Sequence, residues 1–175
     1  MEKIKKHLKN NFAIYVVLVA CLIVIGVAVG VNRTPKVEPV DTSMFRVVTL
    51  KEAIKLFEDD EAKILVMGVD NCIVTKEYIP YLKIAQAKKG YQTYYLDLNT
   101  IKKEDLDDLE ILKEKLDIEY KLYDKVGKFH EFMENTPMTV IIKNKKMVYG
   151  YIGSMSTSTI TLLADKYGVG SNETN

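Results

Sequence analysis

Residues 63–75 read KILVMGVDNCIVT, and this stretch decides the fold. The run from Ile64 to Val69 is continuously apolar and follows a charged residue, which is typical of a strand buried on both faces of a sheet. Asp70-Asn71-Cys72 then forms a short loop. A helix is predicted from Ile73 to Lys89, because its apolar positions fall on one face and Gly90 follows it. The stretch therefore predicts a buried strand that leads to a cysteine at the start of a helix.

The rest of the chain alternates between expected strands and helices. Strands are predicted over residues 45–48, 64–69, 93–98, 138–142 and 146–152, and helices over residues 49–57, 73–89, 103–116 and 156–166. Thr49 and Glu52 match the capping box that opens a helix. The residues of the third helix that are expected to face inward are Leu106, Leu109, Leu112 and Leu116. This order predicts an α/β fold with helices on the faces of a sheet, and the hairpin around residues 144–145 makes the sheet mixed.

Four features together give the chain a resemblance to the thioredoxin superfamily over residues 45–168. Cys72 starts a helix after a buried strand, and Pro80 follows eight residues later, where thioredoxins carry a helix-kinking proline. Thr136-Pro137 stands directly before the penultimate strand, where the family keeps its cis-proline. Gly153 follows the last strand and precedes a terminal helix. The resemblance implies a thioredoxin-like three-layer fold with a mixed central sheet.

The chain departs from this family at its redox motif. The family's Cys-x-x-Cys is here Cys72-Ile73-Val74-Thr75, so a threonine occupies the position of the resolving cysteine. Asn71 stands where the family has a tryptophan, and Val66 stands where thioredoxin has a buried acid that assists the resolving thiol. These losses are mutually consistent. They imply that the domain does not cycle between a dithiol and an internal disulfide.

Cys72 remains a candidate nucleophile. A cysteine at a helix N-terminus feels the positive end of the helix dipole, which favours the thiolate. Lys76, one turn further along, is a possible stabiliser of that thiolate, and the Thr75 hydroxyl can donate a hydrogen bond toward the sulfur, whereas Asp70 opposes it. The alternative is that Cys72 is a small apolar residue under the Ile73-Val74 turn, without a chemical role.

Thr136 and Pro137 are the candidate substrate-binding residues. In the superfamily that the chain resembles, the residue before the cis-proline offers its backbone to an extended substrate strand, a form of β-augmentation. This capacity does not require a second cysteine. Peptide binding beside Cys72 can therefore persist in a protein that has lost dithiol chemistry.

Residues 119–135 form a longer connection than a minimal thioredoxin has at this place, and they are rich in aromatic side chains. One interpretation is an extra helix that packs its aromatics on the core, and the other is a partner-binding lip near Cys72. His130 lies in this segment and could in principle pair with Cys72. The two histidines and two separated cysteines of the chain give no metal site of recognisable spacing, and no cofactor is expected.

The N-terminal part of the chain predicts a membrane anchor. Residues 12–31 (FAIYVVLVACLIVIGVAVGV) contain no charge and are long enough for a transmembrane helix. Residues 1–11 are rich in lysine, which places the N-terminus in the cytoplasm and the domain outside. Residues 32–44 are expected to be a linker and residues 169–175 a polar tail. A rival interpretation is a lipoprotein, because residues 18–21 resemble a lipobox ending at Cys21.

Three functions are considered for a single-pass protein of the bacterial cell membrane, the third being a regulatory or immunity protein that uses the fold only as a spacer. The first is a binding or accessory protein for an exported or membrane partner, with a loose resemblance to the bacteriocin-transport accessory proteins of Gram-positive bacteria. The alternative is a monothiol thiol-disulfide oxidoreductase that uses Cys72 on exported proteins. The formal net charge of +1 gives no indication of a nucleic-acid partner.

Overall fold

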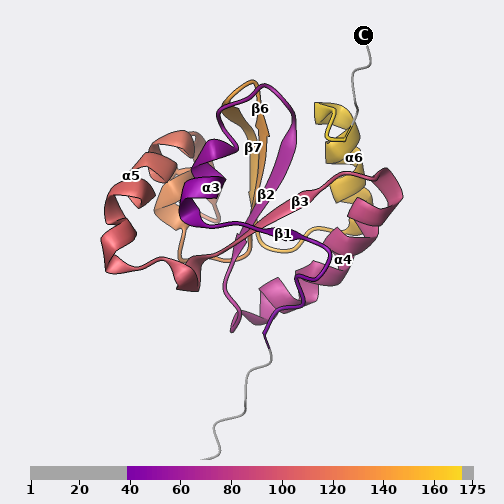
Figure 1. Cartoon of the computed structure of the whole chain (residues 1–175), viewed down its shortest axis with the longest axis horizontal. Coiled ribbons are helices and arrows are strands. Elements are labelled where there is room, and N and C mark those ends of the chain that lie inside the picture. Colours follow the sequence, from indigo (N-terminus) through magenta and orange to yellow (C-terminus); the bar gives the residue numbers. More distant parts are fainter. Residues whose placement is uncertain (1–38, 171–175) are drawn as a thin grey trace, which may run out of the picture. The chain divides into compact units, whose positions relative to one another are not determined.

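The computed structural model describes residues 39–170, which form a five-stranded sheet between two pairs of helices (Figure 1). The predicted basic segment (1–11) and membrane span (12–31) lie outside the described residues, as do the start of the predicted linker and the end of the predicted polar tail. Across residues 39–170, no helix combines the length and apolar character that crossing a membrane requires.

The central sheet has the mixed topology that the sequence predicts. Its strands are β1 (Arg46–Val47), β2 (Lys63–Gly68), β3 (Thr93–Asp97), β6 (Met138–Lys143) and β7 (Lys146–Ile152). Their order is β1-β3-β2-β6-β7. The first three run parallel, whereas β6 pairs antiparallel with both β2 and β7. The turn between β6 and β7 places Asn144 and Lys145 at φ values of 51° and 62°, the left-handed pair that tight hairpins favour.

The helices cover the two faces of this sheet, so the domain has three layers (Figure 1). Helices α3 (Leu50–Lys55) and α5 (Leu106–Lys115) lie on one face, and α4 (Ile73–Lys89) and α6 (Thr157–Tyr167) lie on the other. The predicted capping box of Thr49 and Glu52 opens α3, and Gly90 ends α4 in a left-handed conformation. The length and position of α4 match the sequence-based prediction, including Pro80 inside it.

Strand β2 lies at the centre of the hydrophobic core, and all of its residues are buried. Because side chains alternate across a strand, Ile64 and Val66 pack toward α4 and α6, whereas Leu65 and Met67 pack toward α3 and α5. The sheet therefore separates two apolar layers. The continuous apolar run in the sequence is explained by this burial on both sides.

The inward-facing pattern predicted for residues 103–116 is wrong at one position. Leu112 and Leu116 are fully buried and Leu109 is half-buried, but the Leu106 side chain is 48% exposed. The segment starts with a 3-10 turn, η2 (Lys103–Asp105), and Leu106 is only the first residue of α5. At the spacing of an α-helix, Leu106 stands about 120° around the axis from Leu112, so it lies at the edge of the buried stripe.

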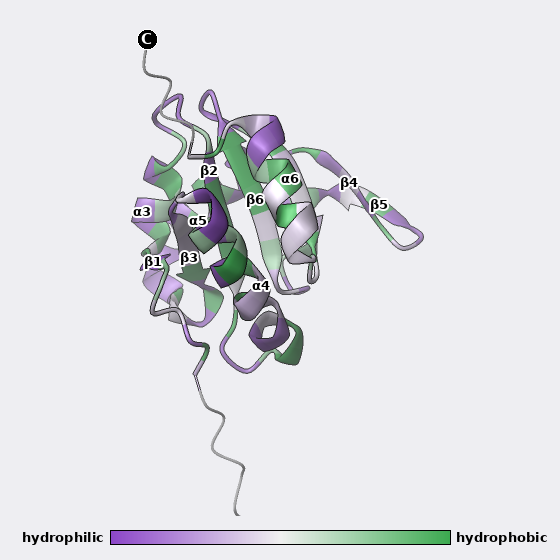
Figure 2. Ribbon diagram, turned by 90° about the vertical axis from the view of Figure 1, so that its right-hand side faces the viewer, coloured by the Kyte–Doolittle hydropathy of each residue, from purple (hydrophilic) through white to green (hydrophobic). Residues whose placement is uncertain are grey.

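Residues 119–135 do not contain the extra α-helix that one interpretation of the sequence predicts. They form a separate two-stranded hairpin, β4 (Glu119–Leu122) and β5 (Lys125–Lys128), followed by the 3-10 turn η3 (Phe129–Phe132). The hairpin projects from the body of the domain (Figure 2). The expected packing of aromatics on the core is confirmed for Phe129 and Phe132, which are buried.

Candidate functional site

Cys72 lies where the chain leaves the C-terminal end of β2 and enters α4. It is the N-cap residue of α4, with an extended backbone and no side-chain cap. Its N–H donates to the Val69 carbonyl oxygen at 3.1 Å, and its own carbonyl oxygen accepts from the Lys76 N–H at 3.1 Å. The side chain is half-buried. The sulfur therefore stands at the positive end of a 17-residue helix and retains access to solvent.

Thr136-Pro137 lies beside this cysteine because of the strand order. Strand β6 runs antiparallel to β2, so its first residue, Met138, pairs with Met67 near the end of β2. The peptide bond of Thr136-Pro137 is cis, as the resemblance implies. The Cys72 thiol donates to the Thr136 carbonyl oxygen across 3.2 Å. The structure thus brings together two of the predicted site segments, which are 64 residues apart in the chain.

The surroundings of Cys72 favour its thiolate. Burial raises the pKa of the thiol, but the hydroxyls of Thr136 and Thr75 and the backbone N–H groups of Thr75 and Val74 together hold that pKa below its ordinary value. The carbonyl oxygen of Thr136 favours the neutral thiol instead, because it accepts a hydrogen bond from S–H and has none to offer the thiolate. The net direction for the Cys72 thiol is a lowered pKa.

Thr75, at the position of the missing resolving cysteine, is fully buried beneath Cys72. Its hydroxyl oxygen has no hydrogen-bond partner in the part of the chain that the structure describes. A buried donor without an acceptor is costly. Ionisation of Cys72 would supply that acceptor.

Lys76 follows Thr75 in the first turn of α4. It is half-exposed in the first turn of α4, and its backbone N–H, rather than its ammonium group, makes the contact with Cys72 that the structure shows. Its role as a stabiliser of the thiolate stays a prediction. His130 lies on η3, and the hydrogen bonds that act on Cys72 come from Thr136 and from α4 rather than from this histidine.

The two residues that follow Cys72 form an exposed apolar surface. The side chains of Ile73 and Val74 are 72% and 40% exposed. They therefore do not bury Cys72 under an apolar turn, which weakens the interpretation of this cysteine as a core residue. Apolar side chains that face solvent beside a reactive group are typical of a contact surface for a partner.

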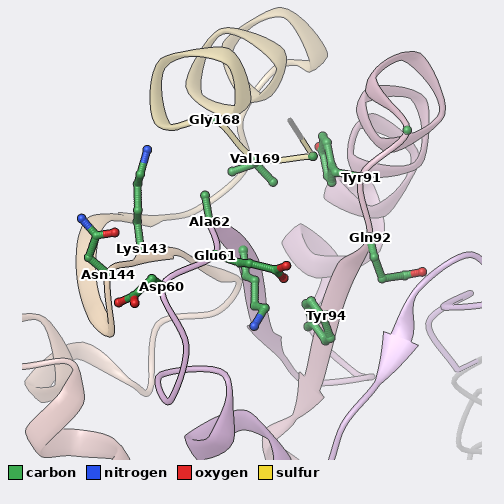
Figure 3. Close-up of a pocket in the computed structure, with 13 residues that line it drawn as sticks. Asp60, Glu61, Ala62, Tyr91, Gln92, Tyr94, Lys143, Asn144, Gly168 and Val169 are labelled. Carbon is green, nitrogen blue, oxygen red and sulfur yellow. The ribbon is translucent and has the colours of Figure 1, made fainter. Parts of the chain in front are cut away.

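A cavity lies at the other end of the sheet from Cys72, and neither Cys72 nor the Thr136-Pro137 loop lines it. It has a volume of about 1010 Å³ and is lined by the start of β2, the residues after α4 and α6, and the end of β6 (Figure 3). Its lining is polar, with Glu61 and Lys143 among its side chains. Within residues 39–170, no group of three or more His, Cys, Asp or Glu side chains is arranged to hold a metal ion.

Tyr95 is a neighbour of the site that the sequence-based reasoning missed. It lies in the middle of β3, directly beside Val66 of β2, and its ring reaches toward Gly68 and Thr75. The sequence feature that could have indicated this neighbour is a tyrosine, Tyr95, on one central strand together with a glycine, Gly68, at the end of the adjacent strand. A single sequence does not reveal their register before the topology is known.

The chain was compared with family models, with curated proteins and with solved structures. No family model matches the chain, and no curated protein matches it in sequence. A solved protein with a thioredoxin fold aligns at a TM-score of 0.50 and 12% identity, covering 71% of this chain and 96% of that one. Thioredoxin from Aeropyrum pernix aligns at a TM-score of 0.48 and 18% identity, covering 68% of this chain and 83% of that one. Chloroplastic thioredoxin z aligns at a TM-score of 0.48 and 11% identity, covering 71% and 94%.

The sheet order, the cis-proline and the first of these alignments together define the class of protein. The chain has the fold of the thioredoxin-like superfamily. Identities this low establish the fold alone, and the chemistry has to be argued from the site.

Proposed function

We propose that this protein is a membrane-tethered monothiol thiol-disulfide exchange protein, with Cys72 as its nucleophile. The observation that carries the proposal is the position of Cys72: it is the N-cap residue of α4, it is half-buried, and it lies beside the cis Thr136-Pro137 peptide. Hydrogen-bond donors lower the pKa of this thiol, and a lowered pKa raises the fraction of the reactive thiolate at neutral pH.

The reaction is an exchange of one disulfide for another. The Cys72 thiolate attacks one sulfur of a partner disulfide, so that a Cys72–partner disulfide forms and the second partner sulfur leaves as a thiolate that takes up a proton. A low-molecular-weight thiol then attacks the partner's sulfur in this mixed disulfide and releases the Cys72 thiolate. One disulfide and one thiol enter, and one disulfide and one thiol leave. No internal resolving cysteine is needed, which is consistent with Thr75.

Partner binding uses the residues around the thiol. In the neutral state the Thr136 carbonyl oxygen accepts the Cys72 proton. When Cys72 is a thiolate or part of a mixed disulfide, that oxygen is free to accept an N–H from an extended peptide. The exposed side chains of Ile73 and Val74 add apolar contact area next to the reacting sulfur. Binding and exchange therefore take place on the same surface.

The second candidate function is a binding or accessory protein that does not use its thiol. The observation that favours it is the β4–β5 hairpin, on which Tyr123 and Val126 are 86% and 64% exposed. A projecting hairpin with exposed apolar side chains offers a contact surface for a partner. The resemblance to bacteriocin-transport accessory proteins makes an exported peptide one class of partner to test.

The tether is part of the proposal. Residues 12–31 are proposed to span the bacterial cell membrane, with the basic residues 1–11 in the cytoplasm and the thioredoxin-like domain outside. The partner is then an exported or membrane protein. Intact mass decides between this anchor and a lipoprotein, because processing at Cys21 would remove the first twenty residues and add a lipid.

The pH dependence of alkylation tests the proposed chemistry. We expect full-length protein carrying Cys21→Ser, in which Cys72 is the remaining cysteine, to react with iodoacetamide with an apparent pKa below the ordinary value of about 8.5. The same protein unfolded in urea is the matched reference. If native and unfolded proteins gave the same apparent pKa and the same slow rate, the thiol-independent binding function would be favoured instead.

A further inference from the structure

The solvent-facing side of α4 carries few charges. At the spacing of an α-helix, Ile73, Pro80 and Ile84 fall on one line along this side. The uncharged exposed residues of the helix are Ile73, Val74, Pro80, Tyr81, Ile84 and Ala87, and the charged ones are Glu77, Lys88 and Lys89. The inner side of α4 is also apolar and packs in the core. A helix that is apolar on both sides is ordinarily covered on both sides.

The helical layer on the other face of the sheet presents a different surface. In η2 and α5, the exposed apolar residues are Leu106 and Ile111, and the exposed charged ones are Lys103, Glu104, Asp107, Glu110, Glu114 and Lys115. Both layers belong to one domain, so a general tolerance for surface apolar residues does not explain the outer face of α4. The α5 layer is suited to water, whereas the α4 layer is suited to a contact.

The described chain begins on α4. Val40 is buried in the apolar cluster that α4 and α6 form with the sheet. The Lys83 ammonium group pairs with the Asp41 carboxylate, and the Gln86 side-chain N–H donates to the Met44 carbonyl oxygen at 2.7 Å. These contacts fasten the start of the described chain to α4. The tether therefore joins the domain on its α4 side.

The proposed tether is shorter than the domain that it holds. Seven residues, 32–38, separate the proposed membrane span from the first described residue. Seven fully extended residues reach at most about 25 Å, and the headgroup layer, about 5–8 Å deep on each side of a bilayer, takes up part of this length. A domain of residues 39–170 has a radius of gyration of about 14 Å, so it is roughly 35 Å across. Its α4 side is therefore held close to the bilayer.

We propose that the outer face of α4 docks on the outer surface of the bilayer, with Ile73, Tyr81 and Ile84 at the boundary between headgroups and acyl chains. Apolar and aromatic side chains favour this depth. Lys76 and Lys88 flank the apolar line on its two sides, and their long side chains can carry the ammonium groups to anionic headgroups. This inference rests on the proposed function, because it requires the proposed anchor.

Docking through α4 narrows the class of substrate. Cys72 is the N-cap residue of α4, so the helix that meets the lipid also brings the reacting sulfur to the membrane surface. The disulfide that Cys72 attacks then belongs to a membrane-proximal segment of an exported or membrane protein. Glu77, the acidic residue of α4, opposes anionic headgroups by like charge. The apolar side chains therefore supply most of the binding.

Quenching of a single tryptophan by brominated lipid tests the docking. The chain has no tryptophan, so Ile84→Trp gives the full-length protein one fluorophore on this face. The protein is reconstituted in nanodiscs of phosphatidylglycerol and phosphatidylcholine, with plain or brominated acyl chains. We expect bromination to lower the fluorescence of Ile84→Trp at least about twofold, because docking places the indole at the acyl boundary. Tyr81→Trp, an independent substitution on the same face, should respond in the same way.

Ile111→Trp is the matched control. Ile84 and Ile111 are 48% and 42% exposed and each lies inside a helix, but Ile111 is on α5, across the sheet from α4. Bromine quenches only at short range, so tethering without docking leaves both tryptophans unaffected. We expect bromination to leave the fluorescence of Ile111→Trp unchanged. Tyr81→Glu, added to Ile84→Trp, should remove most of the quenching, because it places a charge at the acyl boundary.

The outcomes separate the docking from the proposed function. Protein that stays in the nanodiscs but shows no quenching of Ile84→Trp, or equal quenching of Ile84→Trp and Ile111→Trp, would overturn the docking and leave the anchor and the thiol chemistry standing. Fluorescence of Ile84→Trp that changes with the number of copies per disc, and not with bromination, would identify a second copy as the occupant and also overturn it. Protein that does not stay with the nanodiscs would overturn the proposed anchor, and the docking with it.

Discussion

Cys72 lies between groups that oppose a negative charge on its sulfur and groups that favour it. Partial burial opposes the charge, and the Thr136 carbonyl oxygen stabilises the neutral thiol. The hydroxyls of Thr136 and Thr75 favour the charge, and so do the backbone N–H groups that begin α4. Hydrogen bonds to a charged acceptor are stronger than those to a neutral one. The balance therefore favours a thiol that ionises more readily than a free cysteine.

This balance predicts a pH-dependent stability difference between the parent protein and Cys72→Ser. The thiol pKa is lower in the folded state than in the unfolded state, so the thiolate stabilises the folded protein above the unfolded pKa. That contribution is lost as the pH falls through the folded pKa. We expect the free energy of unfolding of the parent, relative to Cys72→Ser, to increase from pH 6 to pH 9.

Urea unfolding of both proteins at the two pH values, under reducing conditions, measures this difference. Groups that titrate equally in the two proteins cancel from the comparison. A difference that is the same at pH 6 and pH 9 would show that folding does not change the Cys72 pKa.

At the level of side chains, the sequence predicts part of the site. That Cys72 and Thr136 lie close together follows from the resemblance to thioredoxins, because their proximity depends on β2 and β6 being neighbours in the sheet. The donor role of the Thr136 hydroxyl does not follow, because it depends on a side-chain direction in an irregular loop. Tyr95 was not predicted either, because its approach to Thr75 requires the register of β2 and β3 and the absence of a side chain at Gly68.

The secondary-structure elements that carry the site were predicted well. The buried strand, the helix after it and the β6–β7 hairpin each have a strong local signal, namely an apolar run, a helical period with a terminal glycine, and a tight turn. The β4–β5 hairpin was missed although Ile118, Tyr120 and Leu122 alternate with charged residues. Three alternating positions are a weak signal, and aromatic content alone does not distinguish a helix from a strand.

Tyr120 of β4 connects the hairpin to the rest of the domain. Its ring makes edge-on contacts with Phe129 and Phe132, at centroid distances of 5.0 and 6.1 Å. Its hydroxyl oxygen accepts from the Ile152 N–H of β7 at 3.2 Å. These contacts join a two-stranded unit, which is marginal by itself, to the edge of the central sheet.

Two tyrosine substitutions separate the structural and the exposed side of this hairpin. Tyr120→Ala is expected to lower the free energy of unfolding by about 1–3 kcal/mol, because it removes both ring contacts and the hydrogen bond. Tyr123→Ala, which changes an exposed side chain at the turn, is expected to change it by less than about 0.5 kcal/mol. Chemical denaturation of both variants measures this, and equal effects would contradict the role given to Tyr120.

At the scale of the whole molecule, the proposed anchor restricts the partners of the domain. A thiol held outside the cytoplasm does not meet cytosolic thioredoxin or NADPH. With one cysteine in residues 39–170, the domain also has no internal thiol to resolve its own mixed disulfide. Exchange with a partner at the same membrane, completed by an external thiol, meets both conditions. Under this proposal, the thioredoxin-like domain needs both a partner disulfide and an external thiol to complete one exchange.

Formation of a mixed disulfide on Cys72 tests this account most directly. Full-length protein carrying Cys21→Ser is incubated at neutral pH with a peptide disulfide, and its intact mass is followed with time. We predict one peptide adduct on Cys72 that forms faster than on the urea-unfolded chain, that a low-molecular-weight thiol removes, and that is absent from the additional variant Cys72→Ser. An adduct that forms no faster on the folded protein than on the unfolded chain would contradict the claim that the fold activates this thiol.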